Sequence, residues 1–137
     1  MMRSGAVFLT FFIVCFMLSG AAAALLIVPM FGDGLGEMLR PATDGSAFPS
    51  MIAGFLIFSA AATAFLLRGW TGSGWLRRGL YVGVGLWVVI IGQYAILPGW
   101  STLPVMPTIG SGIVSGLPAI AGAIAAAFVA DRLVAKS

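Results

Sequence analysis

The stretch LPGWSTLPVMPT, residues 97–108, decides the fold because it interrupts a long uncharged part of the chain. No side chain between Gly79 and Ala130 carries a charge. A helix needs about 20 apolar residues to cross the bilayer's hydrocarbon core, so this part of the chain is long enough for two spanning helices. The quoted stretch holds three prolines in twelve residues, and prolines at this density stop helices. The break therefore predicts two membrane-spanning segments, residues 79–97 and 109–130.

The rest of the chain has the same character. Of its 137 residues, 61% are hydrophobic and 8% are charged, and the mean hydropathy is +1.11. Soluble domains carry about 25% charged residues, so this chain cannot cover itself with a polar surface. Residues 5–30 and 48–67 are two further apolar segments of spanning length. We therefore predict an all-α fold, an integral membrane four-helix bundle, that forms a single membrane domain over residues 1–137.

The charged residues predict how the chain crosses the membrane. Cytoplasmic segments of membrane proteins are enriched in Lys and Arg. With both termini in the cytoplasm, only Arg40 among the seven basic residues lies outside, together with Asp33, Glu37 and Asp44. The six cytoplasmic basic residues are then Arg3, Arg68, Arg77, Arg78, Arg132 and Lys136. We expect a multi-pass protein of the bacterial inner (plasma) membrane, with the lipid bilayer as its main contact.

The first segment has an alternative interpretation as a cleaved signal peptide. Arg3 precedes an apolar centre, and the run SGAAAA, residues 19–24, offers small residues at which cleavage could occur. Against this, the apolar character continues through residues 25–28, beyond the usual length of a signal core. A membrane span is the favoured interpretation, and the other three segments keep their orientation in either case.

The second segment begins at a proline, which is well tolerated in the first turn of a helix because its missing N–H would have no partner there. Gly45, Phe48 and Pro49 precede a glycine-containing apolar helix that ends at Arg68. This arrangement resembles the small membrane subunit of tripartite tricarboxylate transporters, which has four short spans and a Gly-Pro-Gly-(Phe/Tyr)-Phe-Pro-like motif before the second span. The likeness covers about residues 44–68.

The chain also departs from the family pattern. Ser46 and Ala47 stand where the family tends to have proline and glycine or an aromatic residue, and Ser50 stands where a basic residue is frequent. The resemblance implies a solute transporter with a larger integral membrane subunit and a periplasmic binding protein. It implies an accessory role for the small subunit, with no chemistry of its own.

Small residues recur at four-residue spacing in the last two segments. This spacing places them on one helix face, where they let two helices approach closely in lipid. We expect these faces to pack against a helix of this chain or of a partner subunit. The candidate residues are Gly79, Gly83, Gly112, Gly116, Ala119 and Ala123.

Reactive side chains are scarce. The chain has no histidine and one cysteine, Cys15, and none of the four segments contains an ionisable acid or base. We therefore expect no catalytic, cofactor-binding or metal-binding residue and no enzymatic activity. Gln93 and Tyr94 are the strongest polar feature within a span, and they are candidate polar contacts with another helix or with a solute.

Two functions follow from these observations. The first is a non-catalytic small subunit of a larger membrane assembly, most naturally an accessory subunit of an organic-acid transporter. The alternative is a self-sufficient homo-oligomeric small transporter or channel, with Gln93, Tyr94 and the glycines lining a pathway. The net charge of +3 comes from few residues, so nucleic-acid binding is not expected.

Overall fold

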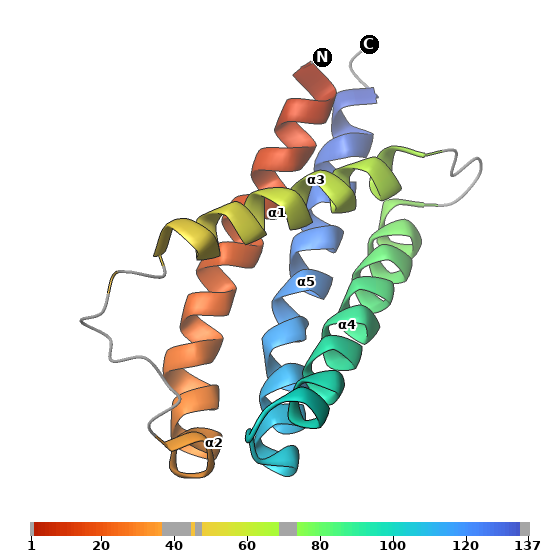
Figure 1. The fold of residues 1–137 in the computed structure, drawn as a ribbon. Coiled ribbons are helices and arrows are strands. Elements are labelled where there is room, and N and C mark those ends of the chain that lie inside the picture. Colours follow the sequence, from red (N-terminus) through yellow and green to blue (C-terminus); the bar gives the residue numbers. More distant parts are fainter. Residues whose placement is uncertain (1, 37–44, 46–47, 69–73, 135–137) are drawn as a thin grey trace.

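A computed structural model of the chain describes residues 2–36, 45, 48–68 and 74–134, and its long elements are all helices (Figure 1). Helices α1, η1 and α2 follow one another without a gap, so the described residues form four long helices, each long and apolar enough to cross a membrane. The elements are α1 (Met2–Ala22), the π-helical turn η1 (Ala23–Ile27), α2 (Val28–Leu35), α3 (Phe48–Leu67), α4 (Trp75–Trp100) and α5 (Val105–Val134).

The break between the last two helices is shorter than the sequence predicts. Helix α4 continues through Pro98 to Trp100, and α5 begins at Val105, so residues 101–104 separate the two helices. Pro98 lies in the last turn of α4, where it removes a single backbone hydrogen bond. Pro107 lies in the first turn of α5, where its missing N–H costs nothing. Helix α4 also begins earlier than predicted, at Trp75.

The first helical segment extends to residues 2–35 and contains the π-helical turn η1. The N–H of Val28 donates to the carbonyl of Ala23, five residues earlier. Pro29 follows at once, and a proline ring would clash with the carbonyl four residues before it in a regular α-helix. A wider turn just before the proline relieves this clash, which gives a physical reason for the π-helical geometry.

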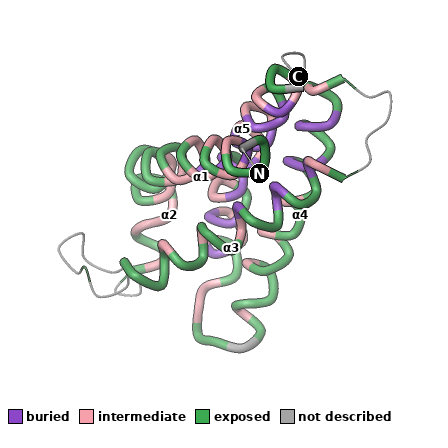
Figure 2. The backbone as a smooth tube through the Cα atoms, turned by 90° about the horizontal axis from the view of Figure 1, so that it is seen from above, coloured by how far each residue is buried: buried purple, intermediate pink, exposed green. Residues whose placement is uncertain are grey.

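Helix α5 lies at the centre of the molecule. It packs along α4 on one side and along α1 on the other, and Figure 2 shows buried positions gathered on the helix faces that point inward. The core consists mainly of its small side chains, against which Val7, Phe11 and Cys15 of α1 pack. The fully buried alanines of α5 are Ala119, Ala123, Ala126, Ala127 and Ala130.

Helix α3 covers the same residues as the predicted second segment, but it does not lie beside the other three helices. It crosses α1 and α5 at a steep angle near the end that holds the chain termini (Figure 1). Its contacts with α1 include aromatic pairs, Phe58 with Phe11 and Phe55 with Phe16. The four predicted helices are present, but α3 does not pack lengthwise with the other three, because its contacts concentrate where it crosses them.

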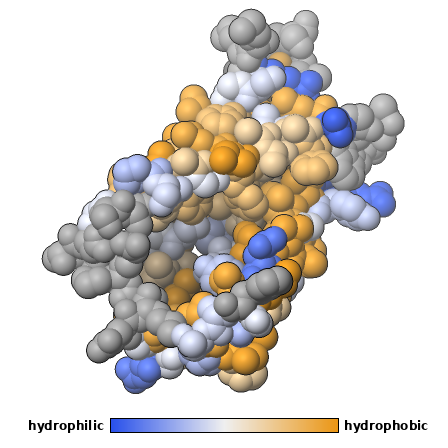
Figure 3. Space-filling view, viewed as in Figure 1, coloured by the Kyte–Doolittle hydropathy of each residue, from blue (hydrophilic) through white to orange (hydrophobic). Residues whose placement is uncertain are grey.

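The two chain termini lie at the same end of the molecule (Figure 1). Arg3 lies near the start of α1, Arg77 and Arg78 lie in the first turn of α4, and Arg132 lies near the end of α5. These arginines therefore belong to one end, which we call the arginine-rich end, and hydrophobic residues cover most of the face between the two ends (Figure 3). The charged residues Glu37, Arg40, Asp44 and Lys136, which also entered the predicted topology, lie outside the described residues.

Candidate functional site

The α4–α5 interface contains the small residues that the sequence singles out. A methyl group built on Gly79 would lie 2.6 Å from the Cα of Ile124, and one built on Gly83 would lie 2.6 Å from the Cα of Ile120. Both contacts are with backbone atoms, which cannot move aside as a flexible side chain can. Gly79 and Gly83 therefore bring the backbones of α4 and α5 into direct contact in the first half of α4.

The second pair of glycines accommodates aromatic side chains instead. A methyl group built on Gly112 would overlap Tyr94, and one built on Gly116 would overlap the indole ring of Trp87. The Nε1–H of Trp87 donates a hydrogen bond of 2.9 Å to the carbonyl oxygen of Ile113. The same two helices are thus in backbone contact at one end and are joined through aromatic rings at the other.

Ala119 and Ala123 are fully buried in the core. The main-chain oxygen of Ala123 lies 3.0 Å from a methyl group built on Gly79, and that of Ala119 lies 3.3 Å from one built on Gly83. The structure therefore brings all six predicted small residues to contacts within this chain.

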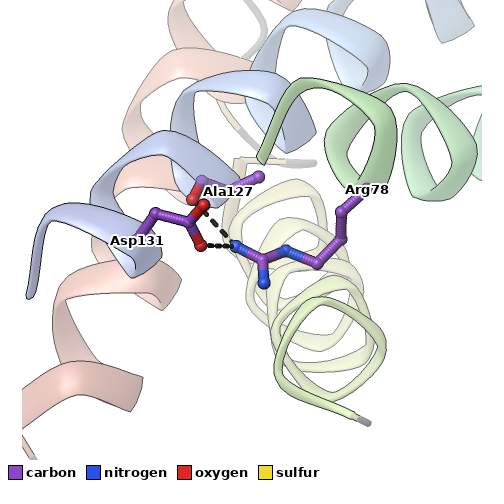
Figure 4. A network of polar contacts seen from close by, with 3 residues as sticks. All are labelled: Arg78, Ala127 and Asp131. Carbon is purple, nitrogen blue, oxygen red and sulfur yellow. Dashed lines mark hydrogen bonds and ion pairs between the residues drawn. The ribbon is translucent and has the colours of Figure 1, made fainter. Parts of the chain in front are cut away.

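The main polar cluster of the described residues joins α4 to α5 at the arginine-rich end (Figure 4). Nη2 of Arg78 donates a 3.1 Å hydrogen bond to the carbonyl oxygen of Ala127 and forms an ion pair with the Oδ1 of Asp131. The Arg78 side chain is 8% exposed and that of Asp131 is 38% exposed. A buried guanidinium is stable only when its charge is matched, so Asp131 and the Ala127 carbonyl hold Arg78 in place.

Aromatic side chains flank this cluster. The rings of Trp75 and Phe128 meet edge to face with centroids 5.2 Å apart. The guanidinium carbon of Arg132 lies 4.9 Å from the centre of the Phe128 ring, within the range of a cation–π contact. The start of α4 and the end of α5 are therefore joined by the ion pair and by the Trp75–Phe128 ring contact, while the cation–π contact lies within α5.

The sequence analysis treats Arg77 and Arg78 alike, as cytoplasmic basic residues, and so misses the buried ion pair. A usable signal exists, because Arg78 and Asp131 flank the uncharged stretch on its two sides. Two antiparallel helices made from that stretch bring its two ends together. An arginine and an aspartate at those ends are then within reach of each other.

Gln93 and the family-like motif lie at the surface. Gln93 is exposed, while its neighbour Tyr94 is half-buried against α5. Gly45 and Phe48 are exposed, and Pro49 is the second residue of α3, in its first turn. Asp44, Ser46 and Ala47 lie outside the described residues.

An apolar groove lies between the first helical segment and α5, with a volume of about 410 Å³. Its lining contains no charged side chain, and Pro118 contributes to its wall on α5. Among the described residues, no group of three or more histidine, cysteine or acidic side chains is placed to hold a metal ion.

The described part of the chain contains four helices able to cross a membrane, which is the feature of a multi-pass membrane protein. The paired helices α4 and α5 form its most extensive contact. Comparisons with protein-family models, with curated proteins and with solved structures found no match to this chain.

The hydrogen bond of Trp87 gives a first prediction. Trp87→Phe keeps a ring over Gly116 but removes the side-chain hydrogen bond to the carbonyl of Ile113. We expect a loss of about 1 kcal/mol in the free energy of unfolding, measured in detergent micelles. Tyr94→Phe keeps the ring against Gly112 and serves as the control, with an expected change below about 0.5 kcal/mol. Equal losses of unfolding free energy in the two variants would contradict a stabilising role for the Trp87 hydrogen bond.

Proposed function

We propose that this chain is a non-catalytic small subunit of a larger membrane assembly, and that the assembly transports organic acids. One observation carries the proposal, an outward surface of α3 on which exposed small residues lie on both sides of the exposed Ile57. A methyl group built on Gly54 meets no atom within 4 Å. Small residues on a helix surface let another helix approach closely in lipid. The exposed small residues of α3 are Ala53, Gly54, Ala60, Ala61 and Ala64.

The position of this face supports a partner outside the chain. The glycine faces of α4 and α5 are already used within the chain, whereas α3 makes its contacts mainly where it crosses α1. Ser59, Ala62, Thr63 and Leu66 are its buried residues, all in its second half. The first half of α3 is thus the part of the helix with most surface left for another subunit.

The transporter class rests on the resemblance at the start of the same helix. Gly45, Phe48 and Pro49 resemble the motif of the small subunit of tripartite tricarboxylate transporters. By this analogy, a larger integral membrane subunit packs on α3, and a periplasmic binding protein delivers the solute. The centres of the described helices contain no Asp, Glu, Lys or Arg, which supports an accessory role.

The proposal includes an orientation. We place the arginine-rich end in the cytoplasm and the chain in the inner membrane of a bacterium. Helix α3 has 20 residues with a mean hydropathy of 2.1, so in the assembly it can cross the bilayer like the other three long helices. Packing against a larger subunit would supply the lengthwise contacts that α3 lacks in the isolated chain.

Purification in mild detergent tests the proposal. The tagged chain, expressed in its native host, is expected to bring down a larger membrane protein in a fixed ratio. The recovery of a lone, stable species that moves solute when reconstituted into liposomes would count against a subunit role.

A matched pair of variants tests whether α3 is the contact face. Gly54→Leu places a large side chain on the outward face of α3 and is expected to reduce recovery of the partner at least tenfold. Gly20→Leu is the control, because Gly20 is also exposed, on α1, and also has no atom near its added methyl group. Both variants are expected to unfold at the wild-type temperature. Full recovery of the partner with Gly54→Leu would show that the partner does not bind this face of α3.

The exposure of Gln93 favours a second candidate function, a homo-oligomeric small transporter or channel. An exposed amide on α4 could line a pathway between copies of this chain. Gln93→Ala would then abolish solute flux in reconstituted vesicles. Unchanged solute flux in the Gln93→Ala variant would show that Gln93 does not contact the solute and would count against this second function.

A further inference from the structure

A groove with an arginine at one end runs along the outer face of α4. Its volume is about 560 Å³. Its positions recur at intervals of four residues, which places them on one side of the helix. Gly79 and Gly83 face α5 from another side, so the groove opens on the surface of the molecule. The groove is lined by Leu76, Arg77, Leu80, Tyr81, Val84 and Gly85.

The length of the groove matches one leaflet of a bilayer. Gly85 lies eight residues beyond Arg77, and at about 1.5 Å per residue the two positions are about 12 Å apart along α4. Half of the hydrocarbon core is about 15 Å thick. If Arg77 lies at the membrane interface, the far end of the groove lies near the middle of the bilayer. A methyl group built on Gly85 meets no atom within 4 Å, so this end of the groove is open.

The charges around the groove favour an anionic occupant. Arg77 is exposed at one end of the groove, and the other lining residues carry no charge. Asp131, the acid described at the arginine-rich end, is already paired with Arg78. Arg3, Arg68 and Arg132 lie at the same end, so the field there is positive and attracts a negatively charged headgroup.

We propose that this groove binds one anionic phospholipid from the leaflet at the arginine-rich end. The phosphate contacts the guanidinium of Arg77, and one acyl chain lies along Leu80, Val84 and Gly85. The inference requires that α4 crosses a membrane, but it requires neither a partner subunit nor a transport activity.

Native mass spectrometry of the full chain tests this proposal. The protein is exchanged from detergent into a defined mixture of phosphatidylglycerol and phosphatidylcholine with identical acyl chains. The wild type is expected to keep one phosphatidylglycerol molecule in preference to phosphatidylcholine. Arg77→Gln is expected to lower the retention of phosphatidylglycerol about fivefold, the contribution of one basic residue near an anionic surface. Gly85→Leu is expected to lower the retention of both lipids because it fills the apolar end.

Each substitution has a matched control. Arg132→Gln removes an arginine from the same end but from α5, and Gly92→Leu adds the same side chain at an exposed glycine of α4 outside the groove. Both controls are expected to keep the lipid, and the four variants are expected to match the wild type in thermal unfolding. Soluble glycerol phosphate at millimolar concentration is expected not to displace the lipid.

Four outcomes would overturn the proposal. Equal losses for Arg77→Gln and Arg132→Gln would show that only the general positive field attracts the lipid. Unchanged retention with Gly85→Leu would show that no acyl chain lies in the groove. Displacement by glycerol phosphate would show a site for the headgroup alone, and a lipid-free dimer lost on Gly85→Leu would show that a second copy of the chain occupies the groove.

Discussion

The variant Gly83→Val is expected to separate α4 from α5 and to cost about 3 kcal/mol of stability, the upper part of the range for overpacked cores. The added Cβ would lie 2.6 Å from the Cα of Ile120 and 3.2 Å from its carbonyl oxygen. These are backbone atoms of the central helix, so the clash can be relieved only by moving one helix away from the other. The buried alanines of α5 would then lose their contacts with α4.

A control on the same helix isolates the clash. Gly85→Val introduces the same side chain with the same helix propensity, but its Cβ meets no atom within 4 Å. We expect Gly83→Val to lower the midpoint of unfolding in detergent strongly, while Gly85→Val stays close to the wild type. Similar midpoints for the two variants would show that the glycine contact does not hold α4 against α5.

The second large effect is expected from the ion pair between Arg78 and Asp131. Asp131→Ala leaves a guanidinium that is 8% exposed without its carboxylate. The Nε of Arg78 already lacks a hydrogen-bond partner among the described residues. No unused acceptor therefore replaces the lost carboxylate. Breaking a buried pair costs about 3–5 kcal/mol, and the partial exposure of Asp131 lowers our expectation to about 2 kcal/mol.

A double-mutant cycle separates the pair from the contributions of its members. Arg78→Leu and Asp131→Leu are each expected to destabilise, while the double variant should be more stable than the sum of the single losses predicts. Arg77→Leu is the neighbouring control, because Arg77 is exposed and outside the pair. Additive losses, or an Asp131→Ala variant as stable as the control, would contradict the role of the ion pair.

The positions of the four long helices and the glycine faces could be predicted from the sequence, because both depend on local composition. An uncharged stretch of spanning length has few alternatives to a helix in a membrane. Gly79 and Gly83 recur at a spacing that marks one helix face in any fold. The exact ends could not be predicted, since Pro98 and Pro107 are tolerated where helices end and begin.

The other features depend on contacts between distant parts of the chain. Arg78 differs from Arg77 only in the side of α4 on which it lies, and this matters only once α5 is in place. Where α3 crosses α1, aromatic side chains of the two helices meet at a few points, which no periodic pattern in α3 reveals. The π-helical turn could have been suspected from Pro29, but its geometry depends on how the preceding residues relax.

The central claim is that four helices cross the bilayer with the arginine-rich end in the cytoplasm, and cysteine labelling in intact cells tests it most directly. Single cysteines are introduced at Gly45, Ser73 and Thr102 in a Cys15→Ala background, and a membrane-impermeant thiol reagent is added. We expect labelling at positions 45 and 102 in intact cells, and labelling at position 73 only after the membrane is permeabilised. Labelling of all three positions from the same side would contradict the account.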